Sequence, residues 1–221
     1  MALSLYLFAA SSLLIAISAI VLGIFVWIKN VKGNLNKAFL LLSLSIGIWS
    51  FGLFMKTISL TKVQALIWAK VFYIGAILIP IFFLYFVVTF LQADGLTKKI
   101  LNITCFLGFI FLGLNFSNLF IKDLMPKHLF PYWSIPGPLF PAFVLYFFIC
   151  ITYAHYLLLK YYRKTSGLKQ NQIKYCLAAS LIAFSGASTD FLLIFDIPVY
   201  PFGHSFILAY PPIIAYAITK Y

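Results

Sequence analysis

Residues 175–200, YCLAASLIAFSGASTDFLLIFDIPVY, hold the clearest structural signal in the chain. The apolar part is long enough to cross a bilayer as a helix, because about 20 residues rising about 1.5 Å each span the hydrocarbon layer. One acid, Asp190, lies inside it, and an ionised group that faces lipid is costly. Small residues, which let a neighbouring backbone approach, share a helical face with this acid: Ala179, Ala183, Gly186 and Ala187. We therefore expect this face to point into a protein interior.

The composition is that of an integral membrane protein. Of 221 residues, 64% are hydrophobic, 9% are charged and none is Glu, whereas the exterior of a soluble protein of this size needs many more polar groups. The net charge of +12 would suggest nucleic acid for a soluble chain. Here the basic residues cluster in short loops between apolar runs, which is typical of membrane topology. We therefore expect membrane lipids as partners and no nucleic acid.

Seven apolar runs predict an all-α membrane protein, a seven-transmembrane-helix bundle that forms a single domain over residues 1–221. The longest loop, 121–141, carries five prolines and Trp133, which suits an ordered segment at the membrane interface. The approximate predicted spans are 3–28, 38–55, 63–91, 100–120, 138–160, 175–195 and 203–219.

The distribution of Lys and Arg predicts the orientation. One side of the predicted bundle collects eleven of the sixteen basic residues, and the other side holds the remaining five, Lys56, Lys62, Lys70, Lys122 and Lys127. Because cytoplasmic loops carry the excess of basic residues, we expect the N-terminus outside and the C-terminus in the cytoplasm.

Prolines predict bends in two of the helices. Pro80 lies near the middle of the third run, and Pro211 and Pro212 lie near the middle of the seventh. Proline removes a backbone donor and clashes with the preceding turn, so we expect a kink at each place.

The sequence contains no recognisable catalytic motif, neither HExxH, GxSxG, CxxC nor a phosphate loop. His128, His155 and His204 fall in different segments, and the three cysteines are far apart. The last run has no lysine at its middle, which argues against a retinal protein. We predict that the chain is not an enzyme and has no cofactor and no metal site.

A polar cluster is predicted near the outer end of the bundle. Counted along their helices, Asp190 and Lys70 lie at similar depths, so an ion pair between them is one interpretation. An alternative is that the third helix begins at Lys70, which then extends to the interface. The other residues of the predicted ligand-binding or buried polar cluster are Tyr73, on the Lys70 face, Trp49, which shares a face with Lys56, and Tyr200 and His204 from the last loop. A structural role for Asp190, or a packing role for Trp49, stays open.

With the segments placed, the sequence resembles the N-terminal seven-helix membrane region of bacterial sensor histidine kinases, which also precedes diguanylate cyclase outputs. Where members often carry Arg, this chain has Lys70. The motifs that carry the resemblance, in order, are 39–44 with 49–52, Trp68-Ala69-Lys70, Tyr73-Ile74-Gly75, Pro80 with 82–86, 136–140, 172–175, 190–192, 197–201 and 215–221.

The resemblance implies a sensory input module in the bacterial cytoplasmic (inner) membrane. We expect it to bind a small amphipathic or apolar ligand, or to sense the bilayer, in its outer half, and to relay through the seventh helix. A homodimer and a cytoplasmic signalling output beyond residue 221 are expected with it. The alternatives are a membrane anchor or dimerisation platform without a ligand, and a small transporter, against which the odd number of spans and the lack of an inverted repeat argue.

Overall fold

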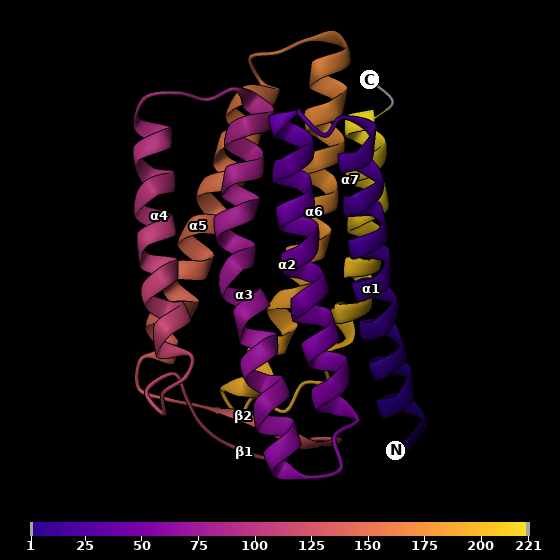
Figure 1. The fold of residues 1–221 in the computed structure, drawn as a ribbon, viewed down its shortest axis with the longest axis vertical. Helices are drawn as coiled ribbons and strands as arrows, with labels where there is room; N and C mark the ends of the chain where they lie inside the picture. Colours follow the sequence, from indigo (N-terminus) through magenta and orange to yellow (C-terminus); the bar gives the residue numbers. More distant parts are fainter. Residues whose placement is uncertain (1, 220–221) are drawn as a thin grey trace.

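The computed structural model describes residues 2–219 and confirms a seven-helix membrane protein (Figure 1). Each of the seven segments is long and apolar enough to cross a bilayer. The helices are α1 (Ala2–Lys29), α2 (Asn34–Thr57), α3 (Lys62–Leu91), α4 (Leu96–Leu114), α5 (Phe140–Tyr162), α6 (Gly167–Ile194) and α7 (Tyr210–Thr219), with the strands β1 (Ile121–Lys127) and β2 (Phe130–Pro136) and the 3₁₀ helix η1 (Phe202–Ala209).

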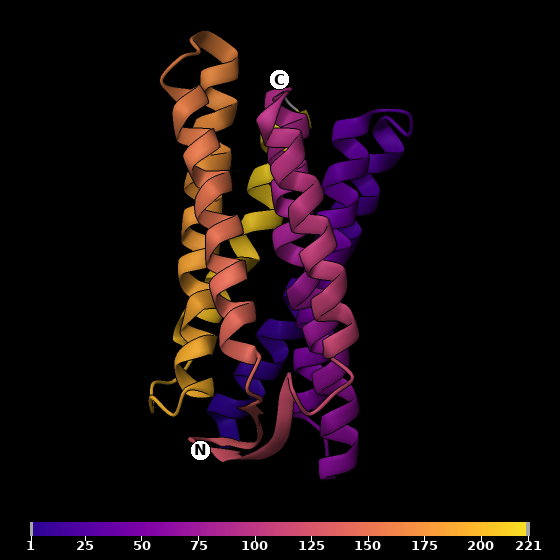
Figure 2. The same ribbon diagram turned by 90° about the vertical axis from the view of Figure 1, so that its left-hand side faces the viewer.

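The helices form two groups with the seventh segment between them. α1, α2 and α3 pack in sequence on one side, α5 packs against α3 and α6, and η1 and α7 contact both α6 and α1 (Figure 2). α4 lies at the edge of the bundle against α3, and most of its surface is left for lipid. The N-terminus and the strands lie at one end, here called the hairpin end, and the C-terminus lies at the other (Figure 1).

Two predicted spans were misplaced. The fourth helix ends at Leu114 and not near residue 120, because residues 115–120 form turns that lead into β1. The sixth helix begins at Gly167, eight residues before the predicted start. Its first two turns are polar and extend beyond the apolar stretch, so hydropathy alone does not detect them.

The long loop is a β-hairpin, which the all-helical prediction missed. β1 and β2 pair antiparallel, with irregularities between Ile121 and Asp123 and between Met125 and Lys127. Both strands of a two-stranded sheet are edges, so prolines in them remove no interior ladder bond. Trp133 is 1% exposed, so it packs into the protein and does not lie free at the membrane interface.

The seventh segment is not one kinked α-helix. Residues 202–209 form a 3₁₀ helix, and Pro211 and Pro212 lie in the first turn of α7, where the missing N–H groups would have no helical partner in any case. Irregular backbone at membrane depth is tolerated where it is buried in protein or lines a cavity. α3 continues through Pro80 as one helix, and a bend there stays a prediction.

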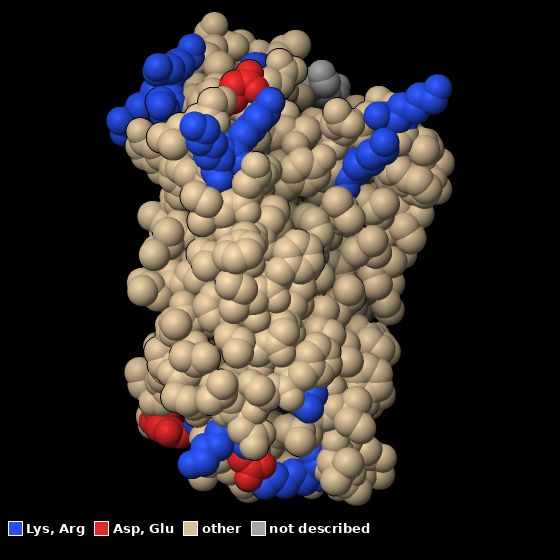
Figure 3. Space-filling view, turned by 60° about the vertical axis from the view of Figure 1, so that its left-hand side comes forward, with Lys and Arg blue, Asp and Glu red and all other residues tan. Residues whose placement is uncertain are grey.

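Charged residues gather at the two ends and leave an apolar band between them (Figure 3). The five basic residues that were grouped on one side, from Lys56 to Lys127, belong to elements of the hairpin end, and the members of the richer set within residues 2–219 lie at the other end. This separation is what a chain spanning a bilayer requires.

Candidate ligand-binding site

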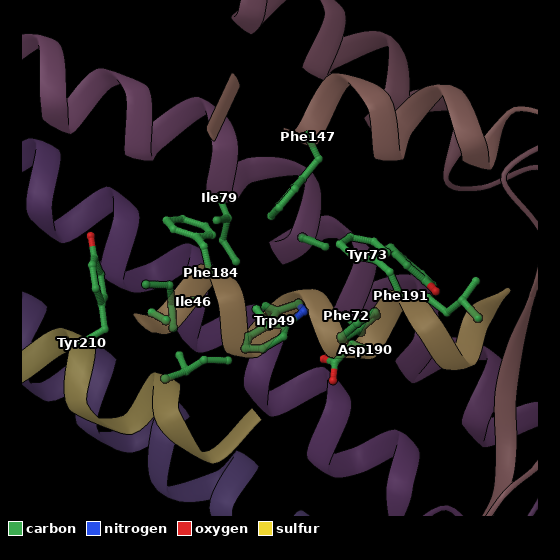
Figure 4. A pocket seen from close by; sticks show the side chains of 15 residues that line it. Ile46, Trp49, Phe72, Tyr73, Ile79, Phe147, Phe184, Asp190, Phe191 and Tyr210 are labelled. Carbon is green, nitrogen blue, oxygen red and sulfur yellow. The ribbon is translucent and has the colours of Figure 1, made fainter. Parts of the chain in front are cut away.

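A cavity of about 60 Å³ lies between the two groups of helices, in the half of the bundle nearer the hairpin (Figure 4). Its wall is almost entirely apolar, and among the described residues Asp190 is the only acid that lines it. Its volume is large enough for a few water molecules or a small organic group. The lining residues are Ile46, Trp49, Phe72, Tyr73, Ala76, Ile79, Phe147, Ala183, Phe184, Ala187, Asp190, Phe191, Ile194, Ile207 and Tyr210.

Asp190 lies on the predicted inward face of α6. Ala183, Gly186 and Asp190 are buried, whereas Leu181 and Ile182 on the opposite face are about half exposed. Asp190 is 4% exposed, and neither carboxylate oxygen has a hydrogen-bond partner. A buried carboxylate without hydrogen-bond partners is costly, so the groups that lie around Asp190 decide how its charge is tolerated.

The close approach of two glycines brings His204 to this carboxylate. A Cβ built on Gly203 of η1 would lie 2.6 Å from the Cα of Gly186 on α6, so only glycine permits the contact. His204, the next residue, is fully buried between the rings of Phe8 and Trp49, with centroid distances of 4.8 and 5.1 Å. Its Nδ1 lies 3.6 Å from Asp190 Oδ2, which is beyond hydrogen-bonding distance.

Ser12 lies within hydrogen-bonding distance of two partners. Its hydroxyl is 2.9 Å from the carbonyl oxygen of Phe8, and Ser12 Oγ is 3.0 Å from His204 Nε2. Because a hydroxyl can donate or accept, the direction of the bond to His204 depends on the tautomer of the imidazole. Ser12 therefore holds the ring of His204 in place with Nδ1 toward Asp190.

The basic residue near Asp190 is Lys56, in the last turn of α2. The sequence predicted that Lys56 shares a face with Trp49 but did not place it in the polar cluster. Its side chain is 2% exposed, and Asp190 acts on it electrostatically. The ammonium lies 4.1 Å from the centroid of the Trp133 ring and 4.8 Å from that of Phe72. Cation–π contacts of this kind stabilise a buried ammonium. The feature of the sequence that could have indicated this role of Lys56 is the helical face that it shares with Trp49.

The predicted pairing of Lys70 with Asp190 is wrong. Among residues 2–219, the ion pairs of Asp190 and of the other acids do not include Lys70. Its carbonyl oxygen accepts a hydrogen bond from Asn115 Nδ2 at 3.0 Å, and its half-buried side chain lines a separate cavity of about 40 Å³ with Lys122. The alternative, a third helix that begins at Lys70, is also wrong, because α3 begins at Lys62.

The other predicted residues divide between the cavity and its surroundings. Trp49 and Tyr73 line the cavity, and the Tyr73 hydroxyl is buried without a hydrogen-bond partner. Tyr200 lies outside it, where its hydroxyl donates to the Ser4 carbonyl oxygen at 3.2 Å and its ring stacks on Phe130. Tyr200 therefore helps to hold the hairpin end together rather than forming part of the cavity wall.

The hairpin closes the bundle next to this site. Lys127 of β1 is 7% exposed; its Nζ donates to the Ile194 carbonyl oxygen at the end of α6 and pairs with Asp196, both at 2.8 Å. On the other side, Lys62 of α3 pairs with Asp123 at 2.7 Å. The hairpin thus links α3 to α6 across the cavity.

The bundle and its buried cavity define an integral membrane protein with seven membrane-spanning helices. Among the described residues, no three His, Cys or Asp side chains are grouped to hold a metal ion. The family model described as the N-terminal 7TM region of histidine kinase matches residues 11–221, and the chain belongs to this family. No curated protein matches the sequence. The chain is therefore the membrane input region of a histidine kinase type of protein.

Proposed function

We propose that this input region senses a small molecule that binds in the cavity beside Asp190. The single observation that carries this proposal is a carboxylate that is 4% exposed, has both oxygens unpartnered and lies on the wall of an apolar cavity. A membrane anchor or dimerisation platform has no need of such a group, because an apolar side chain there would be more stable.

The seventh segment is the element that relays the signal in this proposal. Ile207 of η1 and Tyr210 of α7 line the cavity, and His204 faces Asp190. α7 then runs to the far end of the bundle, where Gln172 Nε2 of α6 donates to its Ala217 carbonyl oxygen at 3.1 Å. A ligand that favours one position of η1 shifts that equilibrium by its difference in affinity for the two positions.

The family and the charge distribution support a proposal about the membrane, the orientation and the partners of the module. We propose one domain in the bacterial cytoplasmic membrane, with the hairpin end outside and the basic end, where α7 ends, in the cytoplasm. A histidine kinase output on the cytoplasmic side, and a homodimer in which two such outputs meet, complete the proposal.

The experiment joins the chain through its seventh segment to a histidine kinase output and measures phosphotransfer in membrane vesicles. Asp190→Asn keeps the volume of the side chain but removes its charge, so we expect the level of phosphotransfer to change by several fold. Asp94→Asn, an equal change at an exposed acid that pairs with Lys98 at the other end of the bundle, is the matched control and should leave it unchanged. Equal phosphotransfer in the wild type and Asp190→Asn would contradict the proposal.

A further inference from the structure

We propose that a second cavity, at the hairpin end between α3, the end of α4 and β1, binds the phosphate of an anionic lipid head group. This cavity has a volume of about 40 Å³ and shares no lining residue with the cavity beside Asp190, so the inference goes beyond the proposed function. One water needs about 10–15 Å³ by the same measure, so there is room for about three waters or one small anionic group.

The cavity carries two positive charges that the protein itself does not pair. Lys70 of α3 and Lys122 of β1 both line it, and neither ammonium has a carboxylate within ion-pair distance among residues 2–219. Asp123, which follows Lys122, is held by Lys62 at 2.7 Å and feels Lys122 only from a longer range. Like charges beside one cavity repel each other, so an anion bound between the two lysines would be stabilised by both.

Asn115, just after α4, gives the wall a fixed polar frame. It is 1% exposed, and its Nδ2 donates to the Lys70 carbonyl oxygen at 3.0 Å, which joins the end of α4 to α3. A carbonyl oxygen only accepts, so Oδ1 is the remaining acceptor of the amide, and it is buried without a partner. An ammonium has three hydrogens, so in this proposal Lys70 donates one to Oδ1 and another to the bound phosphate.

The depth of Lys70 matches the head-group layer of a bilayer. α3 has 30 residues, which is about 45 Å and equals the thickness of a bilayer with its head groups. Lys70 lies eight residues after Lys62, the first residue of α3, or about 12 Å from the hairpin end. A lysine at this depth extends its ammonium to the level of the lipid phosphates.

The surface around the cavity favours a lipid over a free phosphate. Val63 and Ile67, on the same helical face of α3 as Lys70, are 71% and 57% exposed, and Phe116 of the cavity wall is 64% exposed. Basic side chains at the hairpin end border directly on the apolar band (Figure 3). α4 continues the exposed apolar surface toward the other end, where acyl chains would lie against it, with Ile103, Phe106, Phe109 and Ile110.

The test is native mass spectrometry of the full chain released from neutral detergent micelles and titrated with three probes. Phosphatidylglycerol and phosphatidylcholine with the same acyl chains share the phosphate, but the choline cation adds to the charge of the lysines. Glycerol 1-phosphate is the anionic head group without chains. Each lysine near an anionic lipid adds about fivefold in affinity, so the first phosphatidylglycerol should bind about 25-fold more tightly than phosphatidylcholine. Glycerol 1-phosphate should bind more weakly than phosphatidylglycerol.

Variants assign the preference to the cavity. Lys70→Gln combined with Lys122→Gln should bind the two lipids about equally, and each single variant should lose about fivefold of the preference, so the test does not depend on the folding of the double variant. The matched control is Lys32→Gln combined with Lys37→Gln, two exposed lysines at the other end of the bundle. It removes the same charge and should keep the preference of the wild type.

The outcomes separate the site from the source of its anion. Equal binding of the two lipids by the wild type, or an unchanged preference in the double variant of the cavity, would overturn the site. Glycerol 1-phosphate that binds as tightly as phosphatidylglycerol, and loses its affinity in the same double variant, would overturn the lipid and assign the cavity to a free phosphate. An equal loss in the control variant would show a general effect of charge and would also overturn the site.

Discussion

Replacing Gly186 by Ala would place a methyl group against the backbone of η1. A Cβ at position 186 overlaps the Gly203 carbonyl group, and that group belongs to the main chain and cannot rotate away. The contact therefore persists unless α6 and η1 separate, and separation would also move His204 from Asp190. Gly113, on α4, offers a matched control, because a Cβ built there meets nothing within 4 Å.

The expected magnitudes follow from two opposing effects. Overpacking costs about 1–3 kcal/mol, towards the upper value where backbone is the obstacle, while Gly→Ala within a helix gains up to about 1 kcal/mol. Gly186→Ala should therefore lower the free energy of unfolding by about 1–2 kcal/mol. Gly113→Ala should keep or raise it by up to about 1 kcal/mol.

The assay is reversible unfolding in mixed micelles with increasing denaturing detergent, followed by far-ultraviolet circular dichroism. Gly203→Ala approaches the same contact from η1 and should reproduce the loss seen in Gly186→Ala. If Gly186→Ala is as stable as Gly113→Ala, α6 and η1 are not in backbone contact, and the reasoning that places His204 against Asp190 fails.

Two further predictions concern charged residues of the hairpin end. Lys56→Met and Asp190→Leu should each lower the free energy of unfolding, but the double variant should lose at least about 0.5 kcal/mol less than the sum of the two, because removing one charge leaves the other unbalanced. Additive losses in the same unfolding assay would refute the coupling. As a control, Lys70→Met, which replaces a half-buried side chain, should change the free energy of unfolding by no more than about 0.5 kcal/mol. The hydrogen bond from Lys62 lowers the pKa of Asp123 below its usual 3.8, so this contact stabilises the fold above that pH and is lost as the pH falls through the lowered value. Carboxyl NMR of the Lys62→Met variant should show a higher pKa than in the wild type but one still below the usual value, because Leu124 N–H still donates to the carboxylate. An unchanged pKa would contradict the role of Lys62.

The face of α6 is predictable from sequence because one rule dominates it. An acid in an apolar run must avoid lipid, and the small residues at helical spacing from Asp190 mark the face that a neighbouring backbone approaches. The structure confirms this, with Gly186 against Gly203 and Ala183 on the cavity wall.

The choice between Lys56 and Lys70 needs information that sequence spacing does not provide. Counting residues gives the depth of a side chain along its helix, but the rotation of that helix depends on what packs around it. Tyr73 lies three residues from Lys70, about 60° away around the helix, and this offset is enough for one to line the cavity while the other lies beside Asn115 of the neighbouring segment.

The hairpin and η1 depend on contacts between residues far apart in the chain. The β1 pattern is broken by two irregularities and by Pro126, so the alternation that would indicate a strand is weak. In the seventh segment, hydropathy gives the same signal for an α-helix and a 3₁₀ helix. The 3₁₀ helix packs through Gly203 against Gly186, a tertiary contact that hydropathy does not report.

The irregular seventh segment connects the proposed ligand site to the far end of the bundle. A 3₁₀ helix of eight residues has poorer hydrogen-bond geometry than an α-helix, so it stays in place through its contacts with α1 and α6. A molecule larger than the free volume beside Asp190 has to displace part of the cavity wall, and that wall includes Ile207 of η1. η1 continues directly into α7, so a change in η1 reaches the other end without crossing a flexible loop. Under the proposed function, the small free volume of about 60 Å³ would therefore couple ligand binding to a movement of η1 and α7.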